Sequence, residues 1–252
     1  MEPGLVPLTV VIPTLNEADQ IAECMRRAAW ADEVIVADAG SADATVSIAR
    51  RLGARVLERT GPTIAAQRNA AIASARNRWV LAVDADERIS EQLQDEIARV
   101  LRAPSHVAYR VRRRNFYLGK ELTRGHWGKD WVTRLFTGEL RYVERRVHER
   151  LESVSQPGVL QGHLDHIPYR DLSHQIDKMN RYARWGAEDL HQAGRRASVW
   201  DLTARPVGRF LRSYILQGSC FDGRFGVVAS VLGAYTTFLK YAHLWALERR
   251  GD

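Results

Sequence analysis

Cysteine is scarce in this chain: Cys24 and Cys220 are the two that its 252 residues contain. They lie far apart, and neither belongs to a CxxC pair or lies near a histidine at zinc-finger spacing, so neither a disulfide framework nor a structural zinc site is indicated. A reducing compartment fits this usage. The first residues, MEPGLVPLTVVIPTLNE, lack a basic region before their short apolar run, so we predict no signal peptide and a cytoplasmic location.

Long hydrophobic runs are also scarce. Residues 225–239 form an uncharged stretch of 15 residues between Arg224 and Lys240, which is shorter than the roughly 20 residues needed to span a bilayer. A transmembrane helix is therefore disfavoured. Two interpretations stay open: a buried helix that packs on the rest of the protein, or a helix in the membrane interface. The interfacial helix would place near headgroups Tyr241, Trp245, Arg209 and Arg212.

Acidic residues are unevenly distributed, although the whole chain has a net charge of +7. Residues 1–98 carry 10 basic and 15 acidic residues, a net charge of −5. Residues 99–150 carry 14 and 5, a net charge of +9, and residues 171–252 carry 12 and 8, a net charge of +4. The two basic segments suit an anionic partner. Charge alone leaves nucleic acid, acidic lipid and phosphorylated glycan open.

The first hundred residues alternate strand and helix patterns. Apolar, β-branched runs predict strands at residues 8–14, 33–40, 54–59 and 79–83, with helices between them. Ser90 predicts the start of a further helix that runs to Leu101. Strands separated by helices of this length predict parallel βαβ units with functional groups at the strands' carboxyl ends. Six polar residues fall at or just beyond such ends: Thr14, Asn16, Glu17, Asp38, Asp84 and Asp86.

The pattern changes after Pro104. Short β-like segments at 106–118, 131–136 and 139–144 indicate antiparallel strands or long loops added to the sheet. Helical patterns return at residues 172–192, 200–217 and 225–247. We therefore predict a mixed α/β domain over residues 1–170, whose two parts meet at 103/104, and a helical extension over residues 171–252.

Three acids lie within four residues in the segment WVLAVDADERIS, residues 79–90. Asp84, Asp86 and Glu87 follow an apolar run of strand length and repel one another unless positive charge lies among them. Two aspartates in a DxD arrangement can reach one divalent cation, and carboxylate ligands suit Mg²⁺ or Mn²⁺ with substrate phosphates completing the shell. An acidic, solvated turn before the helix explains the same pattern, so DxD alone does not decide.

Three motifs in this order, VVIPTLNE, VIVADAGSADAT and VLAVDADE, resemble the nucleotide-sugar half of glycosyltransferase family 2. GHWGKDWVTRLF, VHERL, HLDHIPYRDL and the C-terminal FDGRFGVVASVLGAYTTFLKYAHLWAL are similar to the bacterial lipopolysaccharide-core β-1,4-glucosyltransferases. The resemblance covers nearly the whole chain. It implies a GT-A (Rossmann-like) mixed sheet with flanking helices, plus a C-terminal helical extension. Residues 1–103 would bind the nucleotide sugar, and residues 104–170 would face the acceptor.

The resemblance also implies roles around the nucleotide. Thr14 and Glu17 would line the nucleoside pocket, Asp38 would hydrogen-bond the uracil edge, and Asn16 would also bind the donor. Many relatives have a second acid where this chain has Ala39, which leaves the uracil role to Asp38 alone.

Around the diphosphate, Asp84 would face the ribose or the donor sugar, and Asp86 would ligate the metal. Arg68 and Asn69 would reach the donor or lie on a helix surface. Arg134 would neutralise the diphosphate or pair with a nearby acid. His148 would contact the metal or a phosphate, or only pack.

Inverting transfer needs a base for the acceptor hydroxyl. Glu149 of the VHE signature is the predicted base, and Asp130 of GKD is the alternative. His163 and His166 in HLDH would point to opposite faces of an extended chain, so we expect no ion shared between them; for His166 we expect a structural role or a diphosphate contact.

The predicted function is that of an inverting, metal-dependent hexosyltransferase. It would move a hexose, expected to be glucose, from a UDP-sugar to a lipopolysaccharide-core acceptor, expected to be a heptose. The protein would be peripheral at the cytoplasmic face of the inner membrane and would bind no nucleic acid. Another lipid-linked glycan or a peptide would be a compatible acceptor. The sequence leaves the oligomeric state open.

Two other classes of function stay open. A magnesium-dependent nucleotidyltransferase would use a similar sheet, although the chain has no G-x-x-x-x-G-K-[ST] loop. A nucleic-acid-binding protein is suggested by the pI of about 9.7 and by the arginines of residues 110–114 near Phe116 and Tyr117. The acidic first part of the chain argues against that second class.

Overall fold

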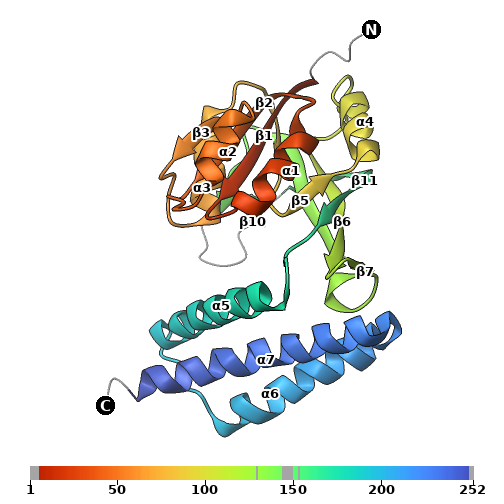
Figure 1. The fold of residues 1–252 in the computed structure, drawn as a ribbon. Helices are drawn as coiled ribbons and strands as arrows, with labels where there is room; N and C mark the ends of the chain where they lie inside the picture. Colours follow the sequence, from red (N-terminus) through yellow and green to blue (C-terminus); the bar gives the residue numbers. More distant parts are fainter. Residues whose placement is uncertain (1–5, 129, 144–149, 153, 250–252) are drawn as a thin grey trace. The chain divides into compact units, whose positions relative to one another are not determined.

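The computed structural model describes residues 6–128, 130–143, 150–152 and 154–249 (Figure 1). Among them, nine strands form one mixed sheet in the order β3-β2-β1-β4-β8-β6-β11-β5, with β7 paired to β6. The parallel part consists of β1 (Val6–Thr14), β2 (Ala31–Asp38), β3 (Arg55–Glu58) and β4 (Trp79–Ala82). The four strands predicted in the first hundred residues are therefore confirmed.

Helices connect these parallel strands, as βαβ units require. They are α1 (Ala18–Ala28), α2 (Thr45–Arg51) and α3 (Ile64–Ser74). The register between β1 and β2 ends with Thr14 opposite Asp38. The polar residues that follow these two strands therefore begin side by side.

The core lies on both faces of the sheet because alternate side chains of a strand point to opposite faces. Leu8, Val10 and Ile12 of β1 pack with residues of α1, α2 and α4 (Glu91–Val100). Val11 packs on the other face with residues of β2 and α3. Ser90 accepts a hydrogen bond from the Leu93 amide and caps α4, as predicted.

Antiparallel strands extend the sheet beyond β4. They are β5 (Glu87–Ile89), β6 (Ala108–Tyr117), β7 (Lys120–Leu122), β8 (Asp130–Thr137) and β11 (Gly158–His166), while β9 (Tyr142–Val143) and β10 (Arg150–Leu151) form a separate pair. No strand was predicted for residues 158–166. In the structure this segment pairs with β5, which places His166 opposite Glu87. A Cβ atom at Gly162 would lie 2.5 Å from the Leu93 Cα atom, so this glycine permits the close approach of β11 to α4.

The chain divides into two compact units. The first, here called the sheet unit, comprises residues 1–113 and 131–166; the second, the helical unit, comprises residues 114–130 and 167–252. The helical unit contains the short turn η1 (Gly125–Trp127) and three long helices, α5 (Leu172–Gln192), α6 (Val199–Leu211) and α7 (Gly223–Glu248). Between α6 and α7 lie a π-helical turn, η2 (Arg212–Leu216), and a 3-10 turn, η3 (Ser219–Asp222). The predicted C-terminal helices are therefore confirmed.

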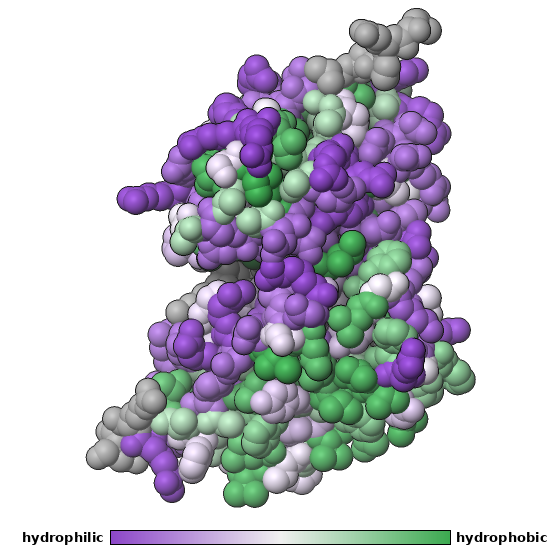
Figure 2. All heavy atoms as spheres, viewed as in Figure 1, coloured by the Kyte–Doolittle hydropathy of each residue, from purple (hydrophilic) through white to green (hydrophobic). Residues whose placement is uncertain are grey.

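The helices of the helical unit enclose a small apolar cluster, in which Ala187, Tyr241 and Leu244 are buried. Figure 2 shows hydrophobic side chains on the surface over α6 and α7. Within the described residues, η3 and α7 together, Ser219–Glu248, form one helical segment that is long and apolar enough to cross a membrane by length and composition.

Candidate active site

The loops after β1 and β2 are joined around the carboxylate of Asp38. Asp38 Oδ2 accepts hydrogen bonds from the amides of Gly40 and Ser41, each at 2.7 Å. Asp38 Oδ1 accepts from Thr14 Oγ1 at 3.1 Å and from Ser41 Oγ at 2.5 Å. Gly40 has a φ of +102°, a conformation that favours glycine. Asp38 is buried, and its carboxylate fixes the shape of this turn; the uracil role remains a prediction.

The same two loops are also linked through Asn16 and Glu17. The Asn16 amide donates to Ser41 Oγ at 2.8 Å, and Asn16 Oδ1 accepts from the Ala42 amide at 2.9 Å. The Glu17 amide donates to Thr45 Oγ1 at 2.8 Å. Ser41 and Thr45 were not predicted as site residues, although GSADAT is rich in residues that bind backbone groups in turns. The predicted nucleoside residues therefore share one rigid corner of the sheet unit.

Arginines surround two of the three clustered acids. Arg134 Nη2 lies 2.5 Å from Asp84 Oδ2 and 2.7 Å from Glu87 Oε1. Arg68 pairs with the other oxygen of Asp84, and Arg113 Nη1 lies 3.2 Å from Glu87 Oε1. The Arg68, Arg134 and Glu87 side chains are almost completely buried, while the Asp84 side chain is 27% exposed. Arginines from other segments of the chain thus offset the repulsion between the carboxylates of Asp84 and Glu87 that the sequence predicted.

These contacts set the ionisation of Asp84. Burial by itself would raise the pKa of the Asp84 carboxyl, but the charges of Arg134, Arg68 and Arg113 outweigh it and hold that pKa well below its usual range. Burial by itself would lower the pKa of Arg134, but Asp84 and Glu87 raise it well above its usual value. Asp84 and Arg134 therefore form a permanently ionised pair at neutral pH.

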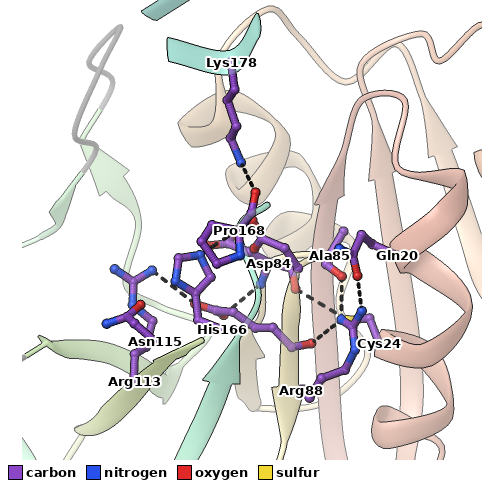
Figure 3. Close-up of polar contacts among 12 residues, drawn as sticks. Gln20, Cys24, Asp84, Ala85, Arg88, Arg113, Asn115, His166, Pro168 and Lys178 are labelled. Carbon is purple, nitrogen blue, oxygen red and sulfur yellow. Dashed lines mark hydrogen bonds and ion pairs between the residues drawn. The ribbon is translucent and has the colours of Figure 1, made fainter. Parts of the chain in front are cut away.

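Arg88 hydrogen-bonds to the backbone of the turn that carries Asp84, Asp86 and Glu87, on the side that faces α1 (Figure 3). Its guanidinium donates to the carbonyl oxygens of Ala85 at 2.8 Å and Glu87 at 2.9 Å, and to the side chain of Gln20. Cys24 Sγ lies 3.5 Å from the carbonyl oxygen of Asp84. Burial raises the pKa of the Cys24 thiol, which therefore stays protonated and serves as a packing group.

Asp86 lies against a histidine that the sequence did not connect with it. His166 Nε2 is 3.6 Å from Asp86 Oδ2, and each side chain is 14% exposed. The pairing of β11 with β5 brings the two together across 80 residues of sequence. His163, by contrast, lies 3.5 Å from Asp165 Oδ1, so the two histidines of HLDH have different partners, as expected.

The pair of Asp86 and His166 suits a divalent cation. A carboxylate oxygen and an imidazole nitrogen are ligands of Mn²⁺, and Mg²⁺ or Mn²⁺ held by few protein ligands completes its shell with water and phosphate oxygens. Among the described residues, no group of three or more histidine, cysteine or acidic side chains could hold a metal. The donor set therefore fits a shared metal–diphosphate site better than a closed structural one.

Arg68 and Asn69 of α3 were predicted to reach the donor or to lie on a helix surface. In the structure both side chains contact β9. Asn69 Nδ2 donates to the Tyr142 carbonyl oxygen at 2.9 Å, and Asn69 Oδ1 accepts from the Tyr142 amide at 2.8 Å. The Arg68 guanidinium lies over the Tyr142 ring at 4.7 Å. In the structure they position β9 and Asp84, and a contact with the donor remains a prediction.

The candidate bases differ in what the structure describes. Asp130 belongs to the helical unit, where Asn115 Nδ2 donates to Asp130 Oδ2 at 3.3 Å and to the Trp127 carbonyl oxygen at 2.8 Å. Asn115 is buried and thus holds Asp130 and the η1 turn together. Glu149 and His148 lie outside the described residues.

The site combines a polar corner at the ends of β1 and β2 with an acid cluster at the end of β4. The profile of glycosyl transferase family 2 matches residues 9–154, more than half of the chain. The chain belongs to glycosyl transferase family 2. The resemblance found in the sequence is confirmed, and the protein is a glycosyltransferase.

Relatives of this glycosyltransferase extend over nearly its whole length. An uncharacterised glycosyltransferase of Rickettsia prowazekii is 29% identical over 259 residues, covering 97% of this chain and 89% of the relative. The lipopolysaccharide core biosynthesis glycosyltransferase LpsC of Rhizobium meliloti is 27% identical over 249 residues, covering 95% and 92%. The crystal structure of S. aureus TarS 1–349 in complex with UDP-GlcNAc is 15% identical, covers 97% and 92%, and has a TM-score of 0.50. The predicted GT-A fold is confirmed.

Proposed function

We propose that this glycosyltransferase is inverting and depends on a divalent metal, and that it moves glucose from UDP-glucose to a heptose of a lipopolysaccharide-core acceptor. The reaction would take place at the cytoplasmic face of the inner membrane. The observation that carries the proposal is the different surroundings of Asp84 and Asp86. Arginines bind Asp84, whereas the carboxylate of Asp86 lies beside an imidazole.

From this difference we infer separate tasks for the two aspartates. Asp84, with Arg68 and Arg134, anchors the acid segment at the end of β4 in one conformation. Asp86 and His166 would hold Mg²⁺ or Mn²⁺. When bound, the ion would offset the negative charge that develops on the departing UDP. Preorganised positive charge of this kind is what inverting transfer requires at the leaving group.

The donor side of the proposal rests on the joined loops. Thr14, Asn16, Glu17 and Asp38 lie in the rigid corner where the resemblance expects the nucleoside. TarS, which shares the fold, was crystallised with UDP-GlcNAc, a donor of the same class. The choice of glucose follows the resemblance to the β-1,4-glucosyltransferases.

The acceptor side rests on the relatives and on charge. LpsC is named for lipopolysaccharide core biosynthesis, and residues 99–150 carry a net charge of +9 that suits a phosphorylated glycan. Glu149 would take the proton of the attacking hydroxyl, and Asp130 is the alternative base. Another lipid-linked glycan or a peptide would satisfy the same chemistry.

Calorimetric titration tests the donor site directly. UDP, UDP-glucose, UDP-galactose and ATP are titrated with and without Mn²⁺ into the wild type, Asp86→Ala and His166→Ala. We expect metal-dependent binding of the UDP compounds, lost in Asp86→Ala and weakened in His166→Ala. Asp95→Ala, which removes an exposed acid of α4, is the matched control and should bind as the wild type does. Absence of UDP binding in the wild type, or binding of ATP with release of pyrophosphate, would contradict the proposal.

Substitution of the two candidate bases tests the chemical step. Glu149→Gln should retain the affinity for the UDP-sugar and lose transfer, since a general base typically contributes a factor of about 10² to 10⁴. Asp130→Asn is measured beside it. Full turnover by Glu149→Gln together with loss of turnover in Asp130→Asn would move the role of base to Asp130.

A further inference from the structure

The turn between α6 and α7 exposes large apolar side chains. Leu216 is 81% exposed and Phe221 is 82% exposed. Ile215 beside them is also exposed, as is Trp200 near the start of α6. We call residues 215–221 the tip. Large apolar side chains grouped in this way on a protein surface mark a contact with another apolar surface.

The apolar surface continues from the tip along α7. Exposed apolar residues recur there at spacings of three, four, three and seven, which places them on one face of a helix. They are Val228, Val231, Tyr235, Phe238 and Trp245. The opposite face, with Tyr241 and Leu244 buried, packs against α5 and α6 (Figure 1). α7 is therefore apolar on its inner and its outer face, as expected of a helix whose outer face meets lipid.

The charge around this surface is cationic. Residues 199–249 contain six basic and three acidic residues. Asp201 and Asp222 are buried, and Glu248 accepts a hydrogen bond from the Ala197 amide at 2.6 Å. Arg212 and Arg224, on either side of the tip, are exposed. Anionic lipid headgroups complement this surface, whereas a second copy of the chain would bring like charges together.

The neighbouring helix indicates the depth of the contact. α5 packs along α7 and exposes the charged side chains of Asp177, Arg181 and Arg184. A bilayer-spanning position of α7 would draw these charges toward the hydrocarbon region, where charged side chains are strongly disfavoured. A position in the headgroup–acyl boundary buries the outer apolar face and leaves α5 in water.

We propose that residues 199–249 form a docking face for an anionic bilayer. The apolar side chains of the tip and of the outer face of α7 enter the boundary between headgroups and acyl chains. Arg212 and Arg224 bind the phosphate groups of the lipids. The partner is the lipid surface itself, and this part of the proposal is independent of the reaction that the enzyme catalyses.

The tip and the adjoining residue Asp222 are hydrogen-bonded to the loop of residues 123–130. Asp222 accepts hydrogen bonds from the amide and hydroxyl of Thr123, at 3.4 Å and 3.2 Å, and from the Arg124 amide at 3.1 Å. The Gly125 amide donates to the Gln217 carbonyl oxygen at 2.9 Å. A Cβ atom at Gly125 would lie 2.1 Å from Ser219 Oγ, so a glycine at this position permits the close approach of the loop to the tip.

Because of these hydrogen bonds, docking of the tip on a bilayer also fixes the position of the loop. The loop carries Trp127 and Asp130, which Asn115 holds together. Docking of the tip therefore holds this acceptor-side loop at the bilayer surface, where a lipid-linked acceptor presents its glycan. This second step rests on the proposed function, in which Asp130 is the alternative base for the acceptor hydroxyl.

Vesicle flotation of the full chain tests the docking face. Wild type, Leu216→Gln/Phe221→Gln and the control Val107→Gln are mixed with phosphatidylcholine vesicles, with or without phosphatidylglycerol. Val107 is exposed to 52% but lies in the sheet unit. The double variant should bind anionic vesicles at least about tenfold more weakly, because two large apolar side chains no longer enter the boundary. Arg212→Gln should weaken binding to the anionic vesicles about fivefold. Its binding to vesicles of phosphatidylcholine alone should equal that of the wild type.

The natural cysteines provide a measure of depth. Cys220 in the tip is partly exposed and Cys24 is buried, so a fluorophore can be attached to Cys220 alone. We expect quenching by lipids that carry the quencher near the headgroup. The control carries Cys220→Ser and Val107→Cys and should show no quenching. Strong quenching by lipids labelled at the end of the acyl chains would overturn the interfacial position.

Other outcomes separate docking from catalysis. Wild type that binds UDP but does not float with anionic vesicles would overturn docking, as would a double variant that floats equally well. A dimer in sedimentation that the double variant loses, without vesicle binding, would assign the face to a second copy. Vesicle binding without UDP binding would leave docking in place and remove the proposed function.

Discussion

The two units of this glycosyltransferase distribute apolar and charged residues in opposite ways. The sheet unit buries many of its apolar residues completely, as at Val10, Leu81 and Leu135, and also encloses a network of charges around Glu87. The helical unit encloses a small apolar cluster and exposes Leu216 and Phe221. Burial stabilises the first arrangement, whereas side chains exposed to water contribute little to folding. The difference supports the proposal that the exposed apolar residues of the helical unit contact a bilayer.

The strongest test of this comparison removes a buried charge from the sheet unit. Arg134→Ala leaves the carboxylates of Asp84 and Glu87 without their shared partner, and we expect the free energy of unfolding to fall by about 3–5 kcal/mol. Urea denaturation followed by circular dichroism measures it. Arg50→Ala removes an exposed pair with Glu58 and should cost less than about 1 kcal/mol. Equal losses in the two variants would contradict the assigned role of Arg134.

In the helical unit, the hydrogen bonds of Asp222 should contribute more to the free energy of unfolding than the exposed apolar residues do. Asp222→Ala leaves the amides of Thr123 and Arg124 without their acceptor, so we expect a loss of about 1–3 kcal/mol in the free energy of unfolding. Thr123→Val, which removes one of the hydrogen bonds, should lose about 1 kcal/mol or less. Hydrogen exchange at residues 123–125 should accelerate in Asp222→Ala; unchanged exchange would show that other contacts hold the loop.

Acid should weaken the sheet unit through Asp84. Its pKa is lower in the folded than in the unfolded protein, so its contribution to stability is complete above about pH 4 and is lost as the pH falls further toward the folded value. The slope for one proton is about 1.4 kcal/mol per pH unit. The difference in unfolding free energy between wild type and Asp84→Asn should therefore shrink below about pH 4. A difference that stays constant from pH 6 to the onset of acid unfolding would contradict the shift.

The smallest effect is expected at the tip. Leu216→Gln and Phe221→Gln should each change the free energy of unfolding by less than about 0.5 kcal/mol, because both side chains are already exposed. Leu81→Ala in the sheet unit, where the side chain is buried, should cost about 2–5 kcal/mol. A large loss from the tip substitutions would mean that these side chains support the helical unit and would remove the contrast.

Local patterns predicted much of the architecture. The strands that became β1 to β4, the cap at Ser90 and the three C-terminal helices follow from spacing and capping residues alone. The strand at residues 158–166 escaped prediction because GVLQGHLDH contains two glycines and two histidines, and its pairing with β5 supplies what its composition lacks.

The sequence by itself determined the alternation of strands and helices, the position of the acid cluster at the end of β4 and the family motifs. Those features depend on residues near one another in the chain. The tertiary structure decided which of the 37 basic residues neutralise Asp84 and Glu87, that His166 lies beside Asp86, and that Asp222 holds the loop after β7. The physical reason is that these pairs join residues 16 to 99 positions apart in the chain. Only the register of the strands and the packing of the helices bring such groups within hydrogen-bonding distance, and no local pattern encodes that register.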